Sequence, residues 1–415
     1  MNQGTWDAKK LGGSMKRGIV NPDLIEERAN LAFDREELQR FSMGQFVYDK
    51  CSELDEFMEK NPELLGSGEE YEMTREELIE HHWKKIKIIS EKGDQYITQN
   101  MDLMNKFWNW GSFLQSVSPL TLHQGMFTQS MYFLASEEQR QKYIPLCDNL
   151  QLFGCYAQTE LGHGSNVQGL ETTATLDLKA DEWVIHTPTI RAAKFWPGGL
   201  GRTATHAVVF AKMLIDGNSF SVHPFLVPIR SLEDHRPLPG VEVGDIGTKL
   251  GYNSMDNGYL LFTNVRIPRE NLLSRLAYVD AQGNFEARGD PRALYIIMQL
   301  TRISILQTCW LSMARSALIS VRYAVCRRQF KTISSSNEER KLLDYQTHMA
   351  ILGPHLAASY VALFLGKTLE DMVHKSNELI AQKGSYEMLE IIHHLSAGFK
   401  AYMTDYAYIA MDEMR

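Results

Sequence analysis

Two glycine-rich segments with polar and aromatic neighbours are the parts of this sequence best suited to hold a flat ligand. One runs from Tyr156 to Ser165 and the other from Lys194 to Gly201. Glycines let the backbone approach a planar ligand closely, and Trp196 could cover a ring face. Gln158 and Thr159 could pair with polar ring edges. A glycine-rich turn between strands is more often only a turn, so each segment alone is weak evidence.

A third segment, Arg322–Phe330, carries three arginines near the expected end of a helix. Guanidinium groups suit a phosphate or pyrophosphate because their planar donors match its oxygens. The alternative is a solvated basic helix end that complements the helix dipole. The residues alone leave both interpretations open.

Other chemistries lack their sequence signals. There is no Walker loop and no HExxH, Gly162–Val167 departs from GxGxxG at its last position, and Ser165 has no GxSxG around it. The charged residues, 43 basic and 51 acidic, give a net charge of −8, which argues against a nucleic-acid partner. The cysteines form no CxxC, so we expect free thiols in a reducing compartment and no metal site; they are Cys51, Cys147, Cys155, Cys309 and Cys326.

Targeting and membrane segments are not evident in the sequence. The first 20 residues hold no continuous apolar stretch, and Asp23 and Glu26 soon follow, which fits neither a secretory signal nor a transit peptide. The longest apolar run, Leu356–Leu365, is about half the length of a bilayer span. We therefore expect it to be a buried helix, and we expect no membrane span.

The elements that must position these segments fall into three zones. Residues 1–150 have helical spacing, with Ser136 as an N-cap and Gln139 three residues later. Residues 151–285 contain short strands joined by turns, which favours an antiparallel β domain. The expected strands are Thr173–Leu178, Trp183–His186, Ala207–Leu214, Phe225–Val227, Tyr259–Phe262 and Val265–Ile267.

Residues 286–415 are helical again. An apolar stripe at three- and four-residue spacing, which includes Leu306, Met313 and Ala324, predicts a long helix. The expected helices are Leu294–Phe330, Leu343–His374 and Tyr386–Met414. Helices this long are typical of a bundle or an oligomer interface.

Taken together, these segments resemble the acyl-CoA oxidases of peroxisomal fatty-acid β-oxidation, within the acyl-CoA dehydrogenase superfamily. Tyr156–Gly164 looks like the family's YAQTExGHG, and Trp196–Gly201 looks like its WPGGLG. Other matching motifs follow in family order, among them Asn21–Leu24, Leu122–His123, Pro237–Gly240, Gly244–Gly247, Asp256–Tyr259 and Arg266–Arg269. The resemblance implies an α+β, acyl-CoA dehydrogenase-like fold: an N-terminal helical domain, a middle antiparallel β domain and a C-terminal helical bundle.

The resemblance also implies FAD bound without a Rossmann motif. Gln158 and Thr159 would contact the flavin ring, and Gly198, beside Trp196, would lie next to its reactive nitrogen. Arg327 and Gln329 match an RxQF motif that reaches the FAD of the neighbouring subunit. The implied assembly is a homodimer with composite sites.

The implied reaction removes hydrogen from a fatty acyl-CoA to give a trans-2-enoyl-CoA. Electrons pass to O2 to give hydrogen peroxide, and the implied location is the peroxisome. The general-base glutamate of the family follows a CGGHGY segment, which we expect beyond Arg415, so Glu413 is not assigned that role. Two alternatives are a dehydrogenase that uses a carrier protein as electron acceptor and an acyl-CoA or FAD binding protein without a base.

Overall fold

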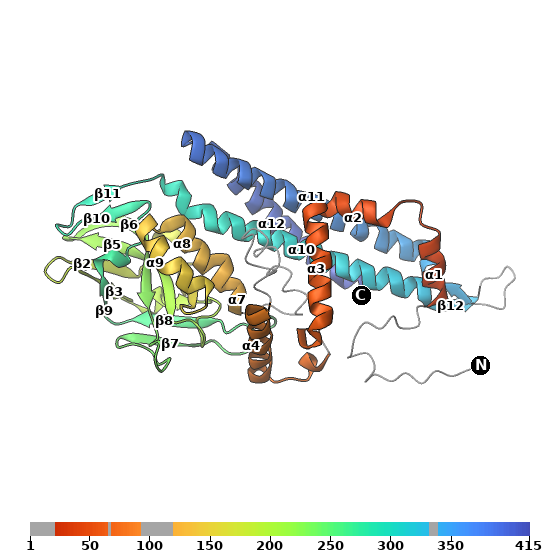
Figure 1. The fold of residues 1–415 in the computed structure, drawn as a ribbon, viewed down its shortest axis with the longest axis horizontal. Helices are drawn as coiled ribbons and strands as arrows, with labels where there is room; N and C mark the ends of the chain where they lie inside the picture. The colour runs from red at the N-terminus through yellow and green to blue at the C-terminus, as the bar shows by residue number, and fades with distance from the viewer. Residues whose placement is uncertain (1–20, 65–67, 93–118, 332–338) are drawn as a thin grey trace. The chain divides into compact units, whose positions relative to one another are not determined.

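The computed structural model describes residues 21–64, 68–92, 119–331 and 339–415. The first 20 residues, considered above for targeting signals, lie outside these ranges. The chain forms two compact units (Figure 1): a helical unit, Met1–Ser67 with Met298–Arg415, and a β-containing unit, Gly68–Ile297. The boundaries at 150 and 285 expected from composition stay predictions.

The β-containing unit is built on one six-stranded sheet and one three-stranded sheet. The large sheet has the order β1-β5-β2-β3-β9, with β6 paired to the other edge of β5. Its strands are β1 Gly154–Ala157, β2 Thr173–Asp177, β3 Glu182–His186, β5 His206–Ile215, β6 Asn218–Pro228 and β9 Val265–Pro268. The small sheet joins β4 Lys194–Phe195, β8 Gly258–Phe262 and β7 Val241–Asp245, and β10 Ala277–Val279 pairs with β11 Phe285–Ala287.

Most strand pairs are antiparallel, as the turn pattern predicted, but β5 pairs in parallel with both β1 and β2. The hairpins β2–β3 and β5–β6 are confirmed. Parallel pairing needs a long crossover, and the segments that follow β1 and β3 supply it with loops and short 3-10 turns, not with long helices. Sequence alternation could not show this, because it reports which face a side chain occupies and not the direction of its neighbour strand.

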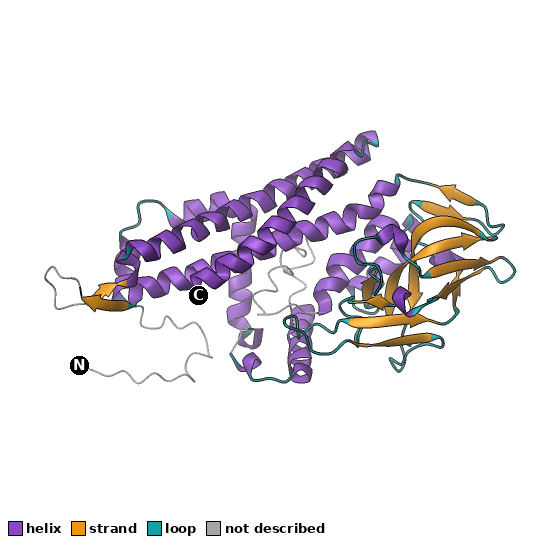
Figure 2. Cartoon of the chain, turned by 180° about the vertical axis from the view of Figure 1, so that it is seen from behind, coloured by secondary structure: helices purple, strands orange, loops and turns teal. Residues whose placement is uncertain are grey.

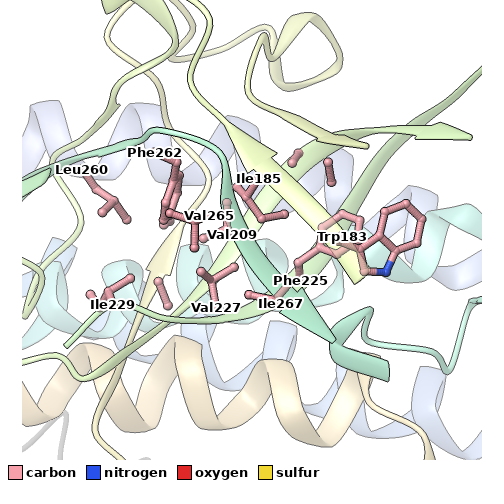
Figure 3. Packing of buried hydrophobic residues seen from close by; sticks show 14 of the residues in the cluster. Trp183, Ile185, Val209, Phe225, Val227, Ile229, Leu260, Phe262, Val265 and Ile267 are labelled. Carbon is pink, nitrogen blue, oxygen red and sulfur yellow. The ribbon is translucent and has the colours of Figure 1, made fainter. Parts of the chain in front are cut away.

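The core of the large sheet is made by alternate residues of its strands (Figure 3). Trp183 is fully buried and meets Phe225 edge to face at 5.2 Å between ring centroids. Its indole N–H donates to the Arg269 carbonyl at 3.0 Å, so burying the ring leaves no polar atom unpaired. This rigid core carries the strand ends from which the candidate site is built.

Helices of the same unit pack beside the sheet, and a buried histidine joins them to β1. They are α4 Arg75–Lys92, α7 Pro119–Leu122, the π-helical turn η5 His123–Thr128, α8 Gln129–Leu134 and α9 Glu137–Asp148. The Nδ1 atom of His123 accepts the Gly154 N–H at 3.0 Å, and its Nε2 lies 3.1 Å from the Cys147 carbonyl. Burial lowers the pKa of His123 to about 4, so the ring is neutral at pH 7. The capping box expected at Ser136 and Gln139 is confirmed at the start of α9.

The helical unit is a set of long helices (Figure 2). It contains α1 Pro22–Ala29, α2 Arg35–Met43, α3 Gln45–Lys60, α10 Ile296–Cys326, α11 Gln346–Lys383 and α12 Glu387–Met414, with the short hairpin β12 Arg328–Lys331 and β13 Glu339–Lys341. The three helices expected near the C-terminus are confirmed with shifted ends. The predicted stripe is also confirmed, since Leu306, Met313 and Ala324 are buried in the core of this unit.

The expectation that Leu356–Leu365 is a buried helix is only partly right. The run lies in α11, but Tyr360 and Val361 are 39% and 61% exposed, while Ala362 is 1% exposed. Apolar residues of this run occur all around the helix, but only one stripe of them packs against the other helices. Among the described residues, Arg292–Cys326 and Gln346–Ile380 are long and apolar enough to cross a bilayer by length and composition, a test that core helices also pass.

Candidate functional site

The structure brings the first two glycine-rich segments together in the β-containing unit. The chain leaving β1 at Gln158 runs beside the chain entering β4. The Phe195 N–H donates to the Thr159 carbonyl at 3.0 Å, and the Leu161 N–H donates to the Ala193 carbonyl at 2.8 Å. Gln158, Thr159, Trp196 and Gly198 therefore belong to two adjacent loops on one scaffold.

A buried ion pair fastens these loops. Both Lys194 and Glu160 have fully buried side chains, and the Lys194 ammonium lies 3.0 Å from Glu160 Oε1. The same ammonium donates to the carbonyls of Gln158 at 3.2 Å and Phe210 at 2.7 Å, so its three protons all have acceptors. The carboxylate also accepts from the backbone and hydroxyl of Thr172.

The ionisation of this pair follows from its surroundings. Burial lowers the pKa of Lys194 to about 8, against the opposing attraction of Glu160. Burial acts to raise the pKa of Glu160, but the charge of Lys194 and the hydrogen bonds from residues 171 and 172 hold it below its ordinary value. Both groups are therefore charged at pH 7, and the loops are held by an ion pair with satisfied hydrogen bonds.

Polar atoms at the edge of the first loop remain open to a ligand. Gln158 and Thr159 are half-buried. The Gln158 side-chain oxygen accepts from the Tyr156 hydroxyl at 3.3 Å. Within the ranges that the structure covers, neither the Gln158 side-chain nitrogen nor the Thr159 hydroxyl has a hydrogen-bond partner. These groups can pair with the polar rim of a flat molecule.

Trp196 has a strained backbone and a half-exposed ring. Its φ is +83°, in the left-handed region that a bulky side chain rarely adopts, and the residue is 52% exposed. The start of β8 holds it there: the Trp196 N–H donates to the Gly258 carbonyl at 3.0 Å, and the Asn257 amide donates to the Trp196 carbonyl at 2.7 Å. Strain maintained in this way is common at ligand sites.

Gly198 is required by the packing of the protein itself. A Cβ at this position would lie 2.7 Å from Met255 Sδ and 3.1 Å from Leu122 Cγ. Any side chain at Gly198 would therefore crowd these two residues, whether or not a ligand is bound. A contact between this glycine and a ligand stays a prediction.

Two further candidate site residues were not predicted from the sequence. Arg230 and Asp256 are both buried, and both contact the loop that follows Trp196. Asp256 begins the matched motif Asp256–Tyr259, but the sequence predicted no role for it. No local signal marked Arg230, because its partners are backbone carbonyls that lie 26 to 30 residues earlier.

The third segment lies in the helical unit, where α10 ends. Arg327 donates to the side-chain oxygen of Gln329 at 3.1 Å, and Tyr345 donates to the Gln329 carbonyl at 2.7 Å. The neighbouring Arg328 instead pairs with Asp23 of α1 at 2.8 Å. Of these two adjacent arginines, only Arg328 is paired with a carboxylate in the part of the chain that the structure describes.

No group of three or more His, Cys, Asp or Glu side chains that could hold a metal ion occurs among the described residues. Of the cysteines, Cys147, Cys155 and Cys309 are buried free thiols, and Cys326 is a half-buried free thiol.

Three family models match consecutive parts of the chain. Residues 34–153 match the acyl-coenzyme A oxidase N-terminal model, residues 155–265 the acyl-CoA dehydrogenase middle domain, and residues 295–415 the acyl-CoA oxidase C-alpha1 domain. The fold is that of the acyl-CoA dehydrogenases, with N-terminal helices, a middle β domain and C-terminal helices. The chain belongs to the acyl-CoA oxidase family.

Individual relatives agree. Mouse peroxisomal acyl-coenzyme A oxidase 2 is 39% identical over 401 residues, which is 96% of this chain and 58% of that protein. The solved structure of acyl-CoA oxidase 1 from Arabidopsis thaliana has a TM-score of 0.87 at 37% identity and covers 94% of this chain and 59% of its own. Acyl-CoA oxidase-2 of Caenorhabditis elegans, bound with FAD, ascaroside-CoA and ATP, has a TM-score of 0.89 at 33% identity and covers 95% and 59%. The chain thus spans less than two thirds of the length of these relatives.

Proposed function

We propose that this protein is an FAD-dependent acyl-CoA oxidase. It would convert a fatty acyl-CoA to the trans-2-enoyl-CoA and pass the electrons to O2 to give hydrogen peroxide, the first step of peroxisomal β-oxidation. The observation that carries the proposal is the hydrogen bonding of the loop that holds Gln158 and Thr159 to residues 193–195, which lead directly into Trp196 and Gly198. Family membership and the FAD in a homologous structure support it.

The residues present fit FAD. The site offers two half-buried polar side chains with open hydrogen-bonding groups, Gln158 and Thr159, and a half-exposed indole, Trp196. A flavin has a polar rim and an apolar ring face, which match these two kinds of surface. Bound FAD would supply the acceptor for the hydride from the β-carbon of the substrate.

The protein's own residues would position and shield the reactants. Gln158 and Thr159 would orient the polar rim of the cofactor, and Trp196 would cover part of it and exclude water. The Lys194–Glu160 pair would keep the first loop fixed, so that no reorganisation is needed when the acyl-CoA binds. We assign no general base within these 415 residues, since Glu413 pairs with His355 at 2.7 Å on the helical unit.

We further propose a homodimer, with Arg327 and Gln329 serving the cofactor of the neighbouring subunit, no membrane span, and a peroxisomal location. The names of the curated relatives support that location.

The test is the visible spectrum of the purified chain after addition of FAD. Palmitoyl-CoA is then added without oxygen, and air is admitted. A flavin band is expected. Bleaching, fast recovery in air and equimolar hydrogen peroxide would identify an oxidase that carries its general base within these residues, where none is assigned. No flavin band would contradict the proposed cofactor.

Two further outcomes separate the alternatives. A band that bleaches but recovers slowly in air would favour the dehydrogenase with a carrier protein as electron acceptor. A band that does not bleach is expected if the general base lies outside these residues, and the same result fits an acyl-CoA and FAD binding protein without a base.

A further inference from the structure

The loop from Trp196 to Ala204 is hydrogen-bonded to two buried side chains of opposite charge, Arg230 and Asp256. The Arg230 guanidinium donates to three backbone carbonyls: to Ala204 at 2.6 Å, and to Leu200 and Gly201 at 2.9 Å each. A guanidinium presents its donors as a rigid planar fork, whereas a lysine ammonium is a compact charge on a flexible stem.

Asp256 accepts hydrogen bonds from backbone N–H groups of the same loop. Its Oδ2 accepts the N–H groups of Arg202 and Thr203, both at 2.8 Å, and its own carbonyl accepts the Gly201 N–H at 2.9 Å. Asp256 is fully buried, and Arg230 is 5% exposed. Arg230 thus donates to carbonyl groups, and Asp256 accepts from N–H groups, along one short loop.

The loop is also restrained by backbone bonds, since the Pro197 carbonyl accepts the Gly258 N–H at 3.1 Å and the Gly199 carbonyl accepts the Ala204 N–H at 2.7 Å. It contains the consecutive glycines Gly198 and Gly199, with Gly199 at φ +79°, and glycine backbones visit many conformations. Burial lowers the pKa of Arg230, and the negative charge of Asp256 opposes that effect. Burying two charges costs desolvation free energy, which their hydrogen bonds to the loop offset.

We propose that Arg230 and Asp256 are positioning residues, which fix the Trp196–Ala204 loop in its binding conformation before the cofactor arrives. This inference rests on the proposed FAD site. Fixing a loop in advance lowers the entropy lost on binding and therefore increases affinity.

The test compares four variants with wild type. Asp256→Ala removes both side-chain hydrogen bonds, whereas Asp256→Asn keeps an oxygen that can accept from both N–H groups. Arg230→Lys keeps the positive charge but loses the planar, forked arrangement of N–H donors. Ile267→Ala lowers the stability of the same unit through its core on β9. The measurements are hydrogen exchange at the amides of Arg202 and Thr203 and FAD affinity from flavin fluorescence quenching.

We expect Asp256→Ala to speed exchange at both amides and to weaken FAD binding about tenfold. Asp256→Asn should restore most of that affinity, and Ile267→Ala should bind like wild type. Unchanged exchange in Asp256→Ala, or a loss of affinity no larger than that of Ile267→Ala, would overturn the positioning role. If Asp256→Ala does not fold, wild-type affinity in Arg230→Lys would overturn it instead. Absence of FAD binding by wild type would overturn the proposed function itself, and this inference with it.

Discussion

Several buried charged side chains among the described residues have more than one partner. Glu70 is an example outside the candidate site: its carboxylate lies 2.8 Å from Lys85 Nζ and 3.3 Å from His81 Nε2, and its side chain is 7% exposed. Burial acts to raise the pKa of Glu70, but the hydrogen bonds and charge of Lys85 and the bond to His81 hold it at about 2.

This shift predicts acid sensitivity. The folded-state pKa of about 2 lies below the ordinary value of 4.5, so the stabilisation is complete above pH 4.5 and is lost as the pH falls toward 2. Its upper limit is about 3 kcal/mol. Glu70→Gln should therefore flatten the acid limb of a stability-versus-pH curve measured by urea unfolding. An exposed acid, as in Glu80→Gln, serves as the control, and equal slopes in the two variants would contradict the prediction.

At the scale of elements, the π-helical turn η5 lies against β1 with no space to spare. A Cβ at Gly154 would lie 2.2 to 2.3 Å from ring atoms of Phe127. Because neither the strand nor the turn can shift freely, the glycine fixes how closely helix and sheet approach.

Gly154→Ala should destabilise the β-containing unit by about 1–3 kcal/mol through overpacking. Phe127→Leu in the same chain should recover part of that loss, because it removes the ring. Gly125→Ala is the matched control, since nothing lies within 4 Å of its added Cβ. Denaturant unfolding of these three variants and of Phe127→Leu alone checks this, and additive effects of the Gly154 and Phe127 substitutions would count against it.

The elements themselves could largely be predicted from sequence, because their periods are local properties. The capping box at Ser136 and the stripe through Leu306 both appeared as expected. The parallel pairing of β5 with β1 could not be foreseen, since it depends on a crossover through loops. The residues that make the site rigid could not be foreseen either: Arg230 acts on carbonyls far along the chain, and nothing in its neighbours signals that.

For the molecule as a whole, the candidate site residues fall in both compact units: Gln158 to Gly198 in one, and Arg327 and Gln329 in the other. The proposed dimer would use the second group on the cofactor of a neighbouring chain. Arg327→Ala should then lower FAD affinity about tenfold by removing a charge-assisted contact with a phosphate, while circular dichroism stays unchanged. Arg322→Ala, which removes an exposed arginine in the last turns of α10, is the control, and equal affinity in both variants would contradict a composite site.

The conformation of Trp196 has a consequence for engineering the protein. Its left-handed backbone costs about 1–3 kcal/mol, which a glycine there would not incur. A screen for heat resistance would therefore tend to select Trp196→Gly, although that change removes the indole proposed to cover the cofactor. Stability and cofactor retention should oppose each other at this position, so thermostable variants need to be screened for flavin content as well as for melting temperature.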